Sequence, residues 1–213
     1  MTTRIHVYAT WLLTTLILAA AIATLALSLN HPVSADLAML HYSAWLINEK
    51  SFVLYRDIFE LNFPAPFLFH SMLGEWIGYE ALPLQCVDLV LLLLFGLISW
   101  KILAPISRPA ALTSTGLFTL LYLINGGEYI LERDVLCLLP TAAAFMFATS
   151  TTLSLRPKTL LSAIFAAIAC SMKPNGVVMV PVLLWFLWQD NRQENTTSKI
   201  KTAIIFLASM ALV

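Results

Sequence analysis

Long apolar runs separated by short polar links dominate the chain and predict a bundle of membrane-spanning helices. A span needs about 20 mostly apolar residues, and the first run, "VYATWLLTTLILAAAIATLALSL" at residues 7–29, meets this length. Six more spans, several of them short, are expected at residues 84–104, 110–125, 134–152, 158–172, 176–189 and 200–213. The pattern therefore predicts an all-α polytopic membrane protein with about seven transmembrane helices.

Composition agrees with this class, because 60% of the residues are hydrophobic and 11% are charged, whereas a soluble domain carries about 25% charged residues. The first run exceeds the about 7–15 residues of a signal-peptide core, so a retained helix is favoured over a cleaved signal. Cys86, Cys137 and Cys170 lie in predicted spans, with no Cys-x-x-Cys spacing and no His at ligand spacing. We interpret them as packing residues rather than metal or redox groups.

One long connection, residues 30–82, is expected to form the first outer loop and to contain two juxtamembrane amphipathic helices. Residues 34–49 place five residues at helical spacing, and these are Leu37, Leu40, His41, Ala44 and Asn48. A second apolar helix, "APFLFHSMLGEWIGY", follows at residues 65–79 and is too short and interrupted to span. Both helices are expected to lie at the membrane interface, where Trp and Tyr are enriched. His41 and His70 are interpreted as packing or surface residues.

Charge placement predicts the orientation. With a cytoplasmic N-terminus, eight of the twelve basic residues fall on the inner side, as the positive-inside rule requires. The acids show the opposite bias, because only Asp190 and Glu194 fall inside. Acidic residues contribute little to topology, so we interpret their outer location as functional.

Three outer stretches carry the candidate site residues. The first, "YRDIFELN", holds Arg56, Asp57, Glu60 and Asn62, the second holds Glu132, Arg133 and Asp134, and the third holds Lys173. Ionisable residues at the mouth of a span usually face a cavity or one another, and a guanidinium group suits a phosphate. The set of three outer cations favours an anionic ligand. The structural alternatives are solvated loop charges, pairing of Arg133 with a neighbouring acid, and snorkelling of Lys173 to the interface.

The order of these motifs resembles the GT-C glycosyltransferases. The first elements are an Asp in the first outer helix, which is Asp36, and a Tyr-Arg-Asp run at residues 55–57 that is followed by Asn62 and Pro64. An Arg-Asp pair then enters a span within residues 132–134, and a Lys-Pro pair follows at residues 173–174. The nearest group is the bacterial family related to protein O-mannosyltransferases and the lipid A aminoarabinose transferase. The resemblance covers residues 36–174. The chain departs from the family pattern at Phe63, where Pro is frequent, and at Glu132.

The resemblance implies a function. Residues 1–213 would form one GT-C-like module, expected to be the N-terminal part of a longer protein. It would transfer a sugar, with inversion, from a polyprenyl-phosphate donor to a lipid, glycan or protein acceptor outside a bacterial inner membrane. Asp36 and Asp134 would be catalytic, with Asp36 as the base. The expected substrate-binding residues are Arg56, Asp57, Glu60, Asn62, Glu132, Arg133 and Lys173. No cofactor is firmly implied, divalent metal use differs among relatives, and no nucleic acid partner is expected.

Two other function classes remain open. A transporter or flippase of lipid-linked sugars would also place cations and acids on the outer side. Such a protein is expected to have internal repeats with broken helices near the membrane midplane, and we find no repeat in this sequence. A non-catalytic membrane subunit or truncated remnant is the third class. The lack of a Gly-rich phosphate loop argues against a nucleotide-sugar enzyme built on a dinucleotide-binding domain.

Overall fold

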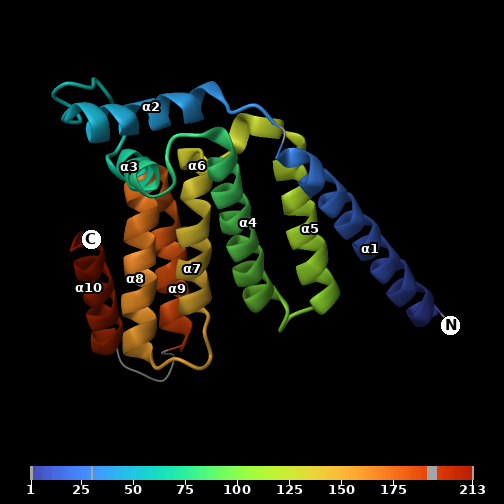
Figure 1. Ribbon diagram of the computed structural model, residues 1–213. Coiled ribbons are helices and arrows are strands. Elements are labelled where there is room, and N and C mark those ends of the chain that lie inside the picture. Colours follow the sequence, from blue (N-terminus) through green and yellow to red (C-terminus); the bar gives the residue numbers. More distant parts are fainter. Residues whose placement is uncertain (1, 30, 191–195, 213) are drawn as a thin grey trace.

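The computed structural model describes residues 2–29, 31–190 and 196–212, and the regular secondary structure in these ranges is helical, apart from an isolated bridge between Leu54 and Ile58. Upright helices stand side by side, α2 runs across their upper ends, and α1 (Thr2–Ser28) is tilted away from them (Figure 1). The upright elements are α4 (Ala81–Leu103), α5 (Arg108–Ile124), α6 (Arg133–Leu136), α7 (Leu138–Ala148), α8 (Leu155–Met172), η2 (Pro174–Met179), α9 (Val180–Asp190) and α10 (Thr196–Ala211).

Three helices of the described chain are long and apolar enough to cross a membrane. They are Tyr8–Ser28 within α1, Ala81–Leu103, and Leu155–Met172, and a shorter apolar helical stretch covers Pro174–Gln189. These helices fit the expectation of a membrane protein, because a helix satisfies its own backbone hydrogen bonds in lipid. The count of seven spans stays a prediction.

The helices differ from the predicted spans by a few residues at their ends; α4, for example, begins at Ala81 rather than at residue 84, and α10 begins at Thr196 rather than at residue 200. The helix predicted at residues 134–152 ends at Ala148, where the Thr149 hydroxyl donates to the Phe145 carbonyl oxygen at 2.8 Å. Polar residues after this point form a turn, in which the hydroxyl oxygens of Ser150 and Thr152 lie 3.2 Å apart. The helix predicted at residues 158–172 begins earlier, at Leu155.

The connection between α1 and α4 contains two helices, as predicted: α2 (Ala35–Lys50) and α3 (Ala65–Ile77). Ser34 caps α2, because its side chain accepts a hydrogen bond from the Leu37 amide at 3.0 Å. Burial follows the predicted face for Leu37, Leu40, His41 and Ala44. The amphipathic character of α2 is not confirmed, because its exposed surface also carries apolar side chains, Met39 and Tyr42.

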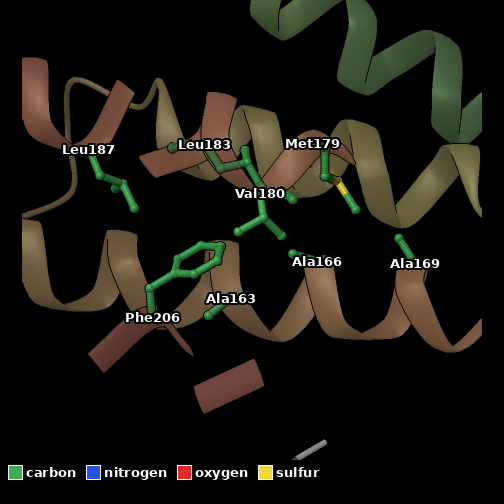
Figure 2. Packing of buried hydrophobic residues seen from close by; sticks show 10 residues of the cluster. Ala163, Ala166, Ala169, Met179, Val180, Leu183, Leu187 and Phe206 are labelled. Atoms are coloured by element: carbon green, nitrogen blue, oxygen red, sulfur yellow. The ribbon is translucent and has the colours of Figure 1, made fainter. Parts of the chain in front are cut away.

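Small residues allow α7, α8, α9 and α10 to pack closely. Ala144 of α7 and Ala163 and Ala166 of α8 are fully buried, and Leu183 and Phe206 fill the space between the helices. Figure 2 shows this cluster. Because lipid tails are as apolar as these side chains, such packing depends on close van der Waals contact rather than on hydrophobic exclusion.

Candidate functional site

Residues from three distant stretches of the chain meet at the upper end of the bundle. Asp36 lies in the first turn of α2, Glu132 precedes the first residue of α6, and Lys173 follows the last residue of α8. The Asp36 carboxylate lies close enough to Glu132 for a hydrogen bond between them to raise the pKa of Glu132. Lys173 donates to Asp134 and forms an ion pair with it. Of the nine predicted site residues, these four and Arg133 therefore belong to one cluster, which we call the carboxylate–cation cluster.

The environment of Glu132 favours its protonated form. Partial burial, the hydrogen bond with Asp36 and the negative charge of Asp134 raise the pKa of Glu132 to about 7, although the charge of Arg133 acts in the opposite direction. Two carboxyl groups this close cannot easily both be ionised. The protonated Glu132 can therefore donate a hydrogen bond to Asp36 near neutral pH, and this pair can hold or release one proton.

Arg133 is held at the same place with unused hydrogen-bonding capacity. Its Nη1 atom is buried and has no hydrogen-bond partner in the described part of the chain. A guanidinium group presents several donors in a fixed plane and binds carboxylates or phosphates through two of them at once. The cluster therefore offers carboxylates that accept protons beside cations that can hold an anion.

A strained backbone conformation presents this cluster. Leu131, directly before Glu132, is fully buried and has φ 49, a left-handed conformation that is uncommon for residues other than glycine. Both of its backbone polar groups are held by side chains from other helices. Its N–H donates to Asp88 Oδ1 at 3.0 Å, and its carbonyl oxygen lies 3.2 Å from Nε2 of His70. These contacts fix the direction in which residues 132–134 leave the turn.

Asp88 of α4 connects this turn to α5. The Tyr122 hydroxyl lies 2.6 Å from Asp88 Oδ1 and 2.9 Å from the Tyr129 carbonyl oxygen, and Asp88 is 3% exposed. We call Asp88, Tyr122, His70 and the Leu131 backbone the support network. The expectation that His70 is a packing or surface residue misses its hydrogen bond, and no role was expected for Asp88 or Tyr122. Asp88 could have been recognised from the sequence, because a lone acid inside an apolar helix needs a polar partner.

Two contacts fix the start of α2, which carries Asp36. The side-chain amide of Gln85 donates to the His31 carbonyl oxygen at 2.7 Å. Gly127 lies so close to the Pro32 carbonyl that a Cβ atom at this position would overlap with it. Glycine is therefore required for the close approach between the η1 turn (Gly126–Tyr129) and the linker. The linker holds Asp36 next to the segment that carries Glu132.

The remaining four predicted residues form a separate group in the loop between α2 and α3. Nε and Nη2 of Arg56 donate to Asp57 at 3.0 and 2.7 Å. Glu60 accepts hydrogen bonds from the backbone and side chain of Asn62. The loop lies beyond the C-terminal end of α2 (Figure 1), whereas Asp36 lies at the N-terminal end. Since α2 has 16 residues, its ends are about 22 Å apart.

An apolar cavity of about 250 Å³ is lined by the residues that follow Asp134 in the sequence. Asp88 and Tyr122 contribute to its wall, as do Val135 and Leu136, which follow Asp134 in the sequence. The other lining side chains are apolar and come from α3, α4, α5, α7 and α8. An apolar chain could therefore lie next to a polar group held by the cluster. Among the described residues, no group of three His, Cys, Asp or Glu side chains is arranged to hold a metal ion.

Comparison with known proteins gives no family assignment for this arrangement: the chain matches no protein-family model, no curated protein and no solved structure.

Proposed function

We propose that the chain is the membrane module of a glycosyltransferase that moves a sugar from a polyprenyl-phosphate donor to a lipid, glycan or protein acceptor on the extracytoplasmic side. One observation carries this proposal: Asp36, Glu132, Asp134 and Lys173, from three distant stretches, meet beside Arg133. Carboxylates next to cations fit the needs of this reaction, in which an acceptor hydroxyl loses a proton and a phosphate leaves.

The proposed roles follow from the contacts within the cluster. Asp36 removes the proton of the acceptor hydroxyl, because it is exposed on α2 and its partner Glu132 can supply or take up a proton. Arg133 binds the leaving phosphate through its free donors. Lys173 adds positive charge there, and Asp134 holds Lys173 in position through their ion pair. Arg56, Asp57, Glu60 and Asn62 stay predicted substrate contacts, and their present hydrogen bonds are local to the loop.

The seven-span arrangement belongs to the same proposal. The shorter upright helices α5 and α10 have 17 and 16 residues, which gives each a length of about 25 Å. This is close to the hydrocarbon thickness of a bilayer, about 30 Å. In Figure 1 successive upright helices run in alternating directions. We infer that α5, α6 with α7, η2 with α9, and α10 also cross, with the N-terminus cytoplasmic in a bacterial inner membrane.

Transfer of a labelled sugar from polyprenyl phosphate, measured in membranes containing the full chain, tests the function. Asp36→Asn is nearly isosteric and is expected to lower the rate by at least about a hundredfold, the scale of losing a general base. The matched control is Glu49→Gln, which neutralises an exposed acid at the other end of the same helix. We expect Glu49→Gln to transfer at the wild-type rate. Equal rates in Asp36→Asn and the wild type would remove Asp36 from the mechanism.

A further inference from the structure

The loop between α2 and α3, residues 51–63, exposes large apolar side chains although its sequence is the most polar stretch of the chain. Phe59 is 89% exposed and Leu61 is 86% exposed, and Phe63 is also exposed. Isolated apolar residues are common on protein surfaces, but a contiguous apolar patch marks a site of interaction. The question is therefore what covers these side chains.

The polar groups of this loop bind one another, although the Arg56 side chain is 69% exposed. Asp57 accepts from Arg56 and also from the Val53 amide at 2.8 Å. Glu60 Oε1 accepts from the Leu61 and Asn62 amides at 2.8 and 3.0 Å. The Tyr55 hydroxyl donates to the Asn62 carbonyl oxygen at 2.5 Å. The side-chain charges of the loop are thus engaged internally, which lowers the cost of moving the loop away from water.

The apolar surface continues along α3. Leu68 and Trp76 are 60% and 72% exposed, and Met72 between them is also exposed. The spacing of four residues places all three on one face of the helix. The opposite face is buried, with Phe67 and Leu73 in the protein interior beside His70. Glu75 is also exposed on the outward face, so the apolar surface there consists of Leu68, Met72 and Trp76. An apolar surface beside a single acid suits the membrane interface, where Trp is enriched.

The position of the loop allows lipid contact. α2 and the loop lie at the upper ends of the upright helices, and the loop extends past the end of α2 (Figure 1). We propose that residues 51–63, together with the exposed face of α3, form an apolar anchor that inserts into the outer lipid leaflet through Phe59, Leu61 and Phe63. The partner is a lipid surface, and insertion reaches the boundary between headgroups and acyl chains, about 5–10 Å deep. This inference does not require glycosyl transfer, but it rests on the membrane orientation given under the proposed function.

The nature of the contact predicts its dependence on lipid charge. Residues 51–63 contain one basic residue, Arg56, and two acidic residues, Asp57 and Glu60. Attraction to anionic lipids therefore cannot be the source of binding, since it requires clustered basic residues. Insertion through apolar burial is expected to be the same in vesicles of phosphatidylcholine alone and in vesicles that also contain phosphatidylglycerol.

Fluorescence quenching in such vesicles tests the anchor. The full chain, with Cys86, Cys137 and Cys170 replaced by Ala, receives Leu61→Cys labelled with the environment-sensitive dye NBD. A reference variant carries the label at Glu49→Cys, an exposed polar position on α2. If Leu61 enters the leaflet to the stated depth, aqueous iodide is expected to quench position 61 at least about threefold less than position 49. Lipids brominated near the headgroup end of the acyl chain should quench position 61 strongly.

Two results would overturn the anchor. Iodide quenching at position 61 equal to that at position 49 would mean that the loop faces water. Protection from both iodide and brominated lipid would mean that a protein surface, such as a second copy of the chain, covers it. Phe59→Cys provides an independent reading by the same criteria if the label at position 61 prevents folding.

Discussion

Substitution of Asp88 tests whether the support network holds the candidate site in place. Asp88→Ala removes the carboxyl oxygen that accepts from the Leu131 amide at 3.0 Å and from the Tyr122 hydroxyl at 2.6 Å. Leu131 is buried and has a left-handed backbone conformation. Without Asp88, its amide loses the hydrogen bond that connects this turn to α4. We expect the bundle to lose stability and residues 132–134 to lose their fixed direction.

The size of the effect follows from the contacts that remain. Each lost hydrogen bond is worth about 1 kcal/mol net, and an amide left buried without a partner costs about 1–3 kcal/mol. Hydrogen bonds between membrane helices average about 0.6 kcal/mol, and removing a buried carboxyl group recovers part of its desolvation cost. We therefore expect Asp88→Ala to lower the free energy of unfolding by about 2–3 kcal/mol.

Tyr122→Phe should cost less, about 1 kcal/mol, because it strands no backbone group. After this change, Asp88 keeps the Leu131 amide, and the Tyr129 carbonyl keeps the Glu132 amide at 3.3 Å. The double variant Asp88→Ala with Tyr122→Phe should cost less than the sum of the two single changes, because both remove the same hydrogen bond.

Unfolding of the purified protein in bicelles, driven by added SDS and followed by circular dichroism, measures these differences. The matched control is Tyr129→Phe. Tyr129 stacks on Tyr122, and its own hydroxyl makes no hydrogen bond in the described part of the chain, so this change should be close to neutral. The reasoning fails if Tyr122→Phe is no more destabilising than Tyr129→Phe, or if Asp88→Ala has the same free energy of unfolding as the wild type.

Three further predictions concern the cluster and its linker. The pKa of Glu132 is raised from the ordinary value of 4.5 to about 7, so the stability contributed by its protonated form is lost as pH rises through 7. Glu132→Gln should abolish this loss, as measured by thermal unfolding from about pH 5 to about pH 8. Gly127→Ala places a Cβ against the Pro32 carbonyl and should lower the free energy of unfolding by about 1–3 kcal/mol, measured by SDS titration, with a neutral result contradicting the close approach. Lys173→Met breaks a partly exposed ion pair with Asp134 and should lower the free energy of unfolding by less than about 1 kcal/mol. The same variant should lower the rate of sugar transfer at least about tenfold. An unchanged transfer rate would remove Lys173 from phosphate binding.

The positions of charged residues in the sequence did not show which of them meet. Nine residues were predicted to form one candidate site, but Arg56 and Asp57, which are neighbours in the loop, bind each other. Neighbours in sequence can always meet within a turn, whereas the meeting of Asp36 with Glu132 depends on the packing of α2 above α6. The periodic apolar pattern contains no information on which of these two arrangements a charged residue adopts.

The sequence by itself determined the class of the protein and the position of several helices. A helix lets an apolar segment in lipid satisfy its own backbone hydrogen bonds, so apolar length alone marks α1, α4 and α8. Tertiary structure decided which polar groups meet and how the turn before Glu132 is held. Asp88 and Leu131 are far apart in sequence, and only the packing of α4 against that turn places a carboxyl group where it can stabilise a left-handed leucine.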